Sequence, residues 1–344
     1  MDWIVEQIPE LTGYTVEWAE SGNYYLSRRN QIFHSADLKP PFRSIGTVDA
    51  PFWKTLASNV RLAQRLLRFL VYNVVPLANG EIFVTFDKTV GIIKGGKYEA
   101  LAGLIRPCRV LRSGCAVDAD GNVFFGEYLA NTERGEMRIY KYPAGGGNRL
   151  EIAHTFPASS IKHIHGLYFD KYTGAIYCLT GDDDAECRIL KSSDGFATIE
   201  TVGGGDESWR AVSVLFDETH FTYGTDAEFR DNQIIRVDRQ TLARQTLGEV
   251  NGTVFYSKSI GKDLFFTTTA ENAPSQKENV AALWLASAEG VCENLVSFEK
   301  DLWPGGLFMF GTIHFPYSNT VGDHLFFSLV GVKGDNKTYC IRQK

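Results

Sequence analysis

The segment 'SSIKHIHGLYFDKYTGAIYCLTGDDDAE' carries the densest titratable chemistry of the chain. His163 and His165 stand two residues apart near its start, and Asp182, Asp183 and Asp184 follow one another near its end, with Glu186 close behind. Residues i and i+2 of a strand point to the same side, so the two imidazoles are expected to face one ligand or one metal. The alternative to a ligand site is that both histidines only hydrogen-bond to backbone groups in a seam between blades. For the acidic run, the alternative to a functional role is a solvated hairpin loop.

A repeated strand pattern indicates how these residues are positioned. Short aromatic and β-branched runs follow turn residues at 'NYYLSRR', 'GEIFVTFD', 'GNVFFGEY', 'GAIYCLTGD', 'THFTYGTD', 'KDLFFTTT' and 'DHLFFSLV', about 40 to 60 residues apart. A second strand follows each run and a further strand precedes most of them, which is typical of radial blades of about four antiparallel strands. The pattern predicts an all-β, seven-bladed β-propeller formed by residues 1–344 as a single domain. Six blades plus an irregular N-terminal piece is the alternative.

The last repeat supplies only about three strands. The N-terminal 'YTVEWAE' is therefore expected to complete the ring, either in a blade of its own or by pairing with the last blade. One helix is expected at about residues 53–70, where leucines recur at helical spacing and Arg61, Arg65 and Arg68 fall on other faces. It is interpreted as a cover over the first seam between blades; a basic edge that gathers an acidic ligand is the alternative.

Propeller connectivity converts sequence position into spatial position. The start of an innermost strand and the end of the second strand share one mouth of the central channel, so His163 and His165 are expected to meet the acidic run of their own blade there. Neighbouring blades add further residues at equivalent positions, namely Glu127, Tyr128, Asn131, Arg134, Arg210, Asp226, Glu228, Arg230, Tyr256 and His314. Arg210 directly follows Trp209 and is expected to enter the channel. Desolvation of its guanidinium costs free energy unless an anion or a carboxylate pairs with it there. Asp226 ends a strand, where an aspartate often only satisfies local backbone N–H groups.

Three chemistries fit these residue types. A glycosidase needs two carboxylates, about 5 to 5.5 Å apart for retention or about 6.5 to 9.5 Å for inversion, and Glu127, Asp182 and Asp226 are candidates. A polysaccharide lyase needs a cation such as Arg210 to neutralise a uronate, with His163, His165, Tyr128 or Tyr256 transferring protons. His163, His165 and His314 with a carboxylate are also able to bind a divalent metal, so the cofactor is left open. The candidate catalytic residues are His163, His165, Tyr128, Arg210, Glu127, Asp182 and Asp226, and the candidate substrate-binding residues are Asn131, Arg134, Asp184, Glu228, Arg230, Tyr256 and His314.

Bulk composition narrows the partners. The 344 residues are 44% hydrophobic and carry a net charge of −6, which disfavours nucleic acid as a partner because phosphate contacts need clustered basic residues. The longest apolar stretch is interrupted by Arg61, Arg65 and Arg68, so no membrane span is expected. The acidic N-terminus lacks the features of a secretory signal, which favours a soluble, cytoplasmic protein with reduced cysteines.

The segments 'GEYLANTERGEMRIY', 'IKHIHGLYFDKYTGAIYCLTGDDDAE', 'WRAVSVLF', 'YGTDAEFRDNQIIRVDR' and 'TVFYS' resemble bacterial BNR or Asp-box-type β-propellers, glycosyl hydrolase-like proteins, some of them associated with polysaccharide gene clusters. The Asp-box 'SSDGFAT' is degenerate, with Phe196 where a glycine is expected. The resemblance covers about 40% of the chain and implies carbohydrate chemistry of the kind found in sialidases or in propeller lyases that use His, Tyr and Arg. The leading hypothesis is an enzyme that cleaves an acidic, uronate-containing glycan, with elimination preferred to hydrolysis. A non-catalytic glycan- or protein-binding propeller is the competing class.

Overall fold

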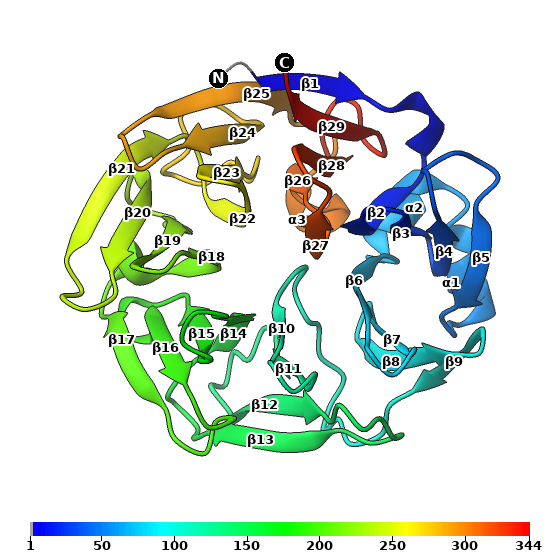
Figure 1. Ribbon diagram of the computed structural model, residues 1–344, viewed down its shortest axis with the longest axis horizontal. Coiled ribbons are helices and arrows are strands. Elements are labelled where there is room, and N and C mark those ends of the chain that lie inside the picture. Colours follow the sequence, from blue (N-terminus) through cyan, green and yellow to red (C-terminus); the bar gives the residue numbers. More distant parts are fainter. Residues whose placement is uncertain (1–2) are drawn as a thin grey trace.

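The computed structural model describes residues 3–344, with the side chains of 319 and 320 excepted. Seven antiparallel sheets are arranged as blades around a central axis, as Figure 1 shows. The seven-bladed β-propeller predicted from the strand repeats is confirmed. None of the helices within residues 3–344 has the length and apolar character that a membrane span requires.

The first three blades take up the N-terminal part of the chain. Blade one contains β2 (Thr15–Glu20), β3 (Asn23–Arg28), β4 (Gln31–Ser35) and β5 (Arg43–Thr47), and β27 (Ser318–Thr320) pairs with β2 in parallel. Blade two contains β6 (Val71–Pro76), β7 (Ile82–Phe86), β8 (Thr89–Lys94) and β9 (Lys97–Ala100). Blade three contains β10 (Cys115–Val117), β11 (Val123–Gly126), β12 (Met137–Tyr142) and β13 (Glu151–Phe156).

The remaining blades follow in chain order. Blade four contains β14 (His163–Phe169), β15 (Ile176–Gly181), β16 (Arg188–Ser192) and β17 (Glu200–Gly204). Blade five contains β18 (Ala211–Phe216), β19 (His220–Thr225), β20 (Asn232–Asp238) and β21 (Arg244–Val250). Blade six contains β22 (Val254–Ile260), β23 (Asp263–Thr268), β24 (Val280–Ala286) and β25 (Cys292–Glu299). Blade seven contains β26 (Thr312–His314), β28 (His324–Val330), β29 (Thr338–Gln343) and β1 (Trp3–Gln7).

The N-terminal strand β1 closes the ring. It pairs antiparallel with β29, from Trp3 opposite Gln343 to Gln7 opposite Tyr339, so β1 is the outermost strand of blade seven (Figure 1). The segment 'YTVEWAE' instead forms β2, the innermost strand of blade one. Two placements were considered for that segment, and the structure shows the first, in which it lies in a blade of its own. The strand that closes the ring is β1, which precedes this segment in the chain.

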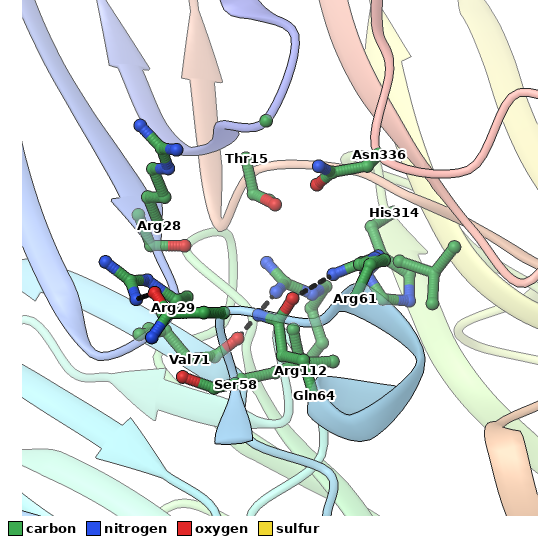
Figure 2. A pocket seen from close by; sticks show the side chains of 15 residues that line it. Thr15, Arg28, Arg29, Ser58, Arg61, Gln64, Val71, Arg112, His314 and Asn336 are labelled. Carbon is green, nitrogen blue, oxygen red and sulfur yellow. Dashed lines mark hydrogen bonds between the residues drawn. The ribbon is translucent and has the colours of Figure 1, made fainter. Parts of the chain in front are cut away.

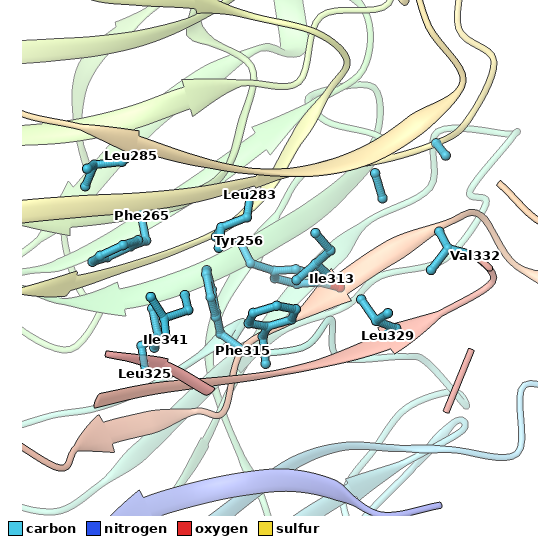
Figure 3. Packing of buried hydrophobic residues seen from close by; sticks show 13 residues of the cluster. Tyr256, Phe265, Leu283, Leu285, Ile313, Phe315, Leu325, Leu329, Val332 and Ile341 are labelled. Carbon is cyan, nitrogen blue, oxygen red and sulfur yellow. The ribbon is translucent and has the colours of Figure 1, made fainter. Parts of the chain in front are cut away.

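Apolar side chains fill the seams between blades. Figure 3 shows the cluster between blades six and seven, where Phe265 and Leu283 face Ile313, Leu325 and Ile341. All five side chains are buried. Similar apolar clusters occupy other seams. They are needed because each blade is covered on both faces by its neighbours, so its strands carry apolar side chains on both faces.

The helical segment consists of two short helices, α1 (Phe52–Ala57) and α2 (Arg61–Leu66), where one helix over 53–70 was expected. Ser58, Asn59 and Val60 separate them. The arginines of this segment contact blade seven and α3 (Gly305–Phe308): Arg61 binds Asp335 through two hydrogen bonds, and the Arg65 Nε donates to the Phe308 carbonyl. These contacts favour the interpretation as a cover that joins blades.

A bulge recurs near the start of the innermost strands. The register shifts around Glu17 in β2, Tyr72 in β6, His165 in β14 and Phe255 in β22, and again between Ala211 and Val214 in β18. An extra residue in one strand re-aims its side chain relative to regular pairing, and bulges of this kind are common beside active sites. The fold therefore carries irregular positions at the rim of its channel.

Candidate functional site

The imidazoles of His163 and His165 meet the Asp182 carboxylate at the mouth where the innermost strands begin. Their Nε2 atoms lie 3.1 Å apart, and these lie 3.3 Å and 3.5 Å from Asp182 Oδ1 respectively. His163 begins β14 and Asp182 directly follows β15, its partner strand, in which Gly181 pairs with His163. The two ends of one hairpin are thus brought together as the connectivity predicts.

Arg210 connects this group to blade five. Its Nη2 lies 3.1 Å from Asp182 Oδ1, and its Nε lies 3.0 Å from Asp226 Oδ2. The backbone supports the contact, because the Asp226 N–H donates to the Arg210 carbonyl at 2.8 Å. One guanidinium therefore bridges carboxylates that end the second strands of two adjacent blades.

Tyr128 lies against the imidazole pair from blade three. Its ring centroid is 4.4 Å from that of His163 and 6.3 Å from that of His165. Among the side chains and backbone groups that the structure describes, none forms a hydrogen bond with its hydroxyl. A free phenol beside two imidazoles and a guanidinium is a group available for proton transfer.

The electrostatics separate the two carboxylates. Burial alone would raise the pKa of Asp182, but hydrogen bonds from His163 and His165 and the charge of Arg210 outweigh it and hold this pKa far below its ordinary value. Burial raises the pKa of Asp226 to about 8; Glu271 and Asp182 reinforce this shift, and Arg210 opposes it. Asp182 is therefore ionised at neutral pH, whereas Asp226 changes its protonation state near pH 8.

The other titratable groups are shifted mainly by burial. Burial, Asp182 and Asp226 raise the pKa of Tyr128 well above its ordinary value, so the phenol keeps its proton. Burial lowers the pKa of His165, although a hydrogen bond to Asp182 opposes this, so the neutral imidazole is favoured. Burial would lower the pKa of Arg210, but Asp226 and Asp182 outweigh it and raise this pKa.

Two further residues of the mouth were not found from the sequence. Lys162 Nζ lies 2.5 Å from Asp182 Oδ2. Glu271, which follows β23, accepts hydrogen bonds from the hydroxyls of Thr269 (2.7 Å) and Thr253 (3.0 Å), and burial raises its pKa. Glu271 lies three residues after the second strand of blade six, so the positional rule that selected Asp182 and Asp226 also points toward it.

Several predicted site residues take other positions. Glu127 is buried away from the imidazole pair, where it accepts hydrogen bonds from the Tyr140 hydroxyl, the Arg138 N–H and Arg106. Asn131 donates to the carbonyls of Lys162 and Gly135, and Arg134 pairs with Asp183 and Glu186, so these two residues connect loops of blades three and four.

The remaining predicted residues are also outside the central group. Asp184 accepts from the Glu207 N–H, the exposed Arg230 pairs with Asp206, and Glu228 is exposed. His314 is buried, with its ring 5.4 Å from that of Tyr256 and its Nε2 2.8 Å from the Thr312 hydroxyl. Burial and the charges of Arg112 and Arg61 lower the pKa of His314 well below its ordinary value.

His314 also borders a small polar cavity of about 120 Å³ between blades one, two and seven, shown in Figure 2. Arg112 reaches its floor, where it donates to the Val71 carbonyl at 2.8 Å and pairs with Glu17. The grouping of His163, His165 and Asp182 therefore forms without the third histidine expected for a metal site.

The Asp-box lies on the turn between β16 and β17, at the opposite end of the strands from His163. Asp194 accepts from the Thr198 N–H at 2.9 Å, and the Phe196 N–H donates to the Ser192 hydroxyl at 2.8 Å. Phe196 has φ 74°, which explains why a glycine is expected there. All six cysteines are free thiols.

Comparisons with known proteins define the fold. No family model matches the chain, and no curated protein matches it. Among solved structures, an oligogalacturonate lyase in complex with manganese aligns with a TM-score of 0.60 at 8% identity, over 100% of this chain and 91% of that one. An ancestral GH74 enzyme aligns with a TM-score of 0.59 at 13% identity, over 95% of this chain and 45% of that one.

The extracellular domain of a proposed one-component system from B. thetaiotaomicron also aligns, with a TM-score of 0.59 at 11% identity over 100% of this chain. This chain spans 40% of that domain's length. The structural neighbours thus include propeller enzymes that act on carbohydrates, and at these identities the likeness is one of fold.

Proposed function

We propose that the protein cleaves an acidic, uronate-containing glycan by β-elimination at the mouth formed by blades three to six. The observation that carries this proposal is the bridging position of Arg210, 3.1 Å from Asp182 and 3.0 Å from Asp226, beside the imidazole pair and Tyr128. Oligogalacturonate lyase and a GH74 enzyme among the structural neighbours support carbohydrate as the substrate class.

Elimination needs three contributions, and the mouth offers a group for each. The guanidinium of Arg210 pairs with the uronate carboxylate and stabilises the charge that develops when the C5 proton leaves. Asp226, with a pKa of about 8, accepts that proton, because a general base works best when its pKa lies near the working pH. Tyr128 keeps its proton at neutral pH and donates it to the departing glycosidic oxygen.

Hydrolysis is the second candidate, and the opposite pKa shifts of the two carboxylates favour it. A protonated Asp226 would serve as the general acid, and the ionised Asp182 as the nucleophile or base. The two reactions require opposite protonation states of Asp226. Elimination is therefore expected to speed up as the pH rises through about 8, whereas hydrolysis is expected to slow down.

The test is a pH series on a panel of uronate-containing oligosaccharides, with one readout that identifies each reaction. Elimination creates a conjugated double bond that absorbs in the ultraviolet, and hydrolysis creates new reducing ends without that absorbance. Ultraviolet-absorbing products at a rate that rises toward pH 8 are expected. New reducing ends without ultraviolet absorbance would show hydrolysis and contradict elimination. Measurable glycan affinity without either signal would show that the protein is a binding propeller and not an enzyme of this kind.

A further inference from the structure

The two imidazoles of the site direct lone pairs at each other. His163 Nδ1 lies 3.1 Å from the Leu129 carbonyl oxygen, and His165 Nδ1 lies 2.9 Å from the Ala211 carbonyl oxygen. A carbonyl oxygen only accepts, so each Nδ1 carries a hydrogen, and each Nε2 of a neutral ring then presents a lone pair. These Nε2 atoms are 3.1 Å apart, which requires a positive species, a proton or a metal ion, between them.

The third group of the cluster has the spacing of a metal ligand. Asp182 Oδ1 lies 3.3 Å and 3.5 Å from the two Nε2 atoms. With the 3.1 Å separation between the nitrogens, these sides form a triangle whose circumscribed circle has a radius of about 1.9 Å. Nitrogen and oxygen ligands bind ions such as Zn²⁺ at about 2.0 to 2.2 Å. An ion at that distance from all three atoms would lie slightly out of their plane.

Charged groups from neighbouring strand ends surround the triangle. Arg210 lies within 4.0 Å of three carboxylates, those of Asp182, Glu207 and Asp226. Lys162, which pairs with Asp182, is the other cation of the group. Three carboxyl groups and two cations therefore line a largely buried region, where His165 is 3% and Arg210 14% exposed.

The surroundings also hold the ligands in place. Backbone carbonyls fix the tautomer and orientation of both rings, and Arg210 and Lys162 orient the carboxylate, which is the pattern of outer-shell support at metal sites. Gly181 gives the room, because a Cβ there would lie 3.0 Å from His165 Cε1 and 3.1 Å from Arg210 Cγ. A side chain at this position would crowd both the His165 imidazole and the Arg210 side chain that orients Asp182.

We infer that His163, His165 and Asp182 bind a divalent first-row transition-metal ion. Two imidazoles and one carboxylate suit Mn²⁺, Fe²⁺, Co²⁺ or Zn²⁺, and three ligands leave coordination positions open. If the proposed function holds, an open position would be available to the carboxylate of the acidic glycan that pairs with Arg210. The metal site itself does not depend on that reaction.

The test measures metal binding by the full chain. Purified protein, stripped with a chelator, is titrated with Mn²⁺ while the electron paramagnetic resonance signal of free Mn²⁺ is followed, and Zn²⁺ is measured by elemental analysis after dialysis. One equivalent per chain is expected, with an increase in melting temperature on saturation, because a ligand that binds only the folded state stabilises it. Less than a tenth of an equivalent of either ion at saturating concentration would overturn the inference.

Variants locate the ion. His163→Ala and Asp182→Asn are expected to weaken binding at least about tenfold, and His154→Ala on β13 serves as the matched imidazole control with unchanged binding. Circular dichroism confirms folding, and Asp182→Asn, which keeps the side-chain shape, covers the case in which His163→Ala does not fold. One equivalent bound equally by all variants would also overturn the inference. Metal binding without glycan cleavage would leave this inference standing and refute the proposed function, and cleavage without metal binding would do the reverse.

Discussion

At the scale of single residues, the chemistry of the mouth depends on how alternation along a strand divides neighbours. Glu127 and Tyr128 are adjacent, and the Tyr128 ring lies against His163 while the Glu127 carboxylate is buried with Tyr140 and Arg106. Successive side chains of an extended chain point to opposite sides, so only one of such a pair reaches the channel. The sequence pattern identified both residues as candidates but did not show which of the two side chains faces the channel.

Asp226 gives the site a pH-dependent effect on stability. Its pKa rises from 3.8 to about 8 on folding, so its contribution to stability is complete below about pH 4 and is lost as the pH rises toward 8. We expect the free energy of unfolding, measured with urea, to fall from pH 5 to pH 8 by a larger amount in the wild type than in Asp226→Asn. The exposed Asp231→Asn should behave like the wild type. An equal fall in Asp226→Asn and the wild type would contradict the burial of an ionisable Asp226.

At the scale of elements, the ends of strands carry the site, and this is why much of it was predictable. His163 and His165 lie at the start of a first strand, and Asp182, Arg210 and Asp226 lie directly beside an end of a first or second strand. Propeller connectivity brings those strand ends together. The residues that lie elsewhere, such as Arg134 and Asn131, occupy longer loops. Loop conformation depends on contacts between blades, which strand periodicity does not encode.

The strand end at Gly181 provides a test of the packing. Gly181→Ala places a Cβ 3.0 Å from His165 Cε1 and 3.1 Å from Arg210 Cγ, so we expect a loss of about 1 to 3 kcal/mol in the free energy of unfolding. Gly145→Ala is the matched control, since no heavy atom lies within 4 Å of a Cβ there, and it should change stability by less than about 1 kcal/mol. Urea denaturation measures both. Equal stabilities of the two variants would show that the imidazole and the guanidinium are not packed this closely.

At the scale of the whole molecule, the ring closes through a five-residue strand that the strand repeats did not single out. The seven aromatic runs predicted the blade number, because each marks one buried strand. The closing strand β1 is 'WIVEQ', only five residues long and without the turn-flanked aromatic run of the repeats. Its pairing with β29 is a contact between the two ends of the chain, which a local pattern does not reveal.

Deletion of residues 1–7 tests this closure. The deletion removes the pairing with β29 and the edge-to-face contact of Trp3 with Phe265, at 4.9 Å between ring centroids. Because the deletion removes the five-residue strand pairing together with a partly buried aromatic side chain, we expect a clearly lower melting temperature. Leu302→Ala, at a side chain that is 97% exposed, should leave the melting temperature nearly unchanged. A deletion variant as stable as the wild type would mean that β1 does not close the ring.

The most direct test of the proposed active site is the turnover of uronate-containing oligosaccharides by Tyr128→Phe and the wild type. This change removes one hydroxyl to which no described group hydrogen-bonds, so folding should be unaffected while the rate of elimination falls about 10²-fold or more. Tyr172→Phe, at a side chain 42% exposed, is the control and should retain full turnover. Equal rates for Tyr128→Phe and the wild type would contradict the proposed role of Tyr128 at this mouth.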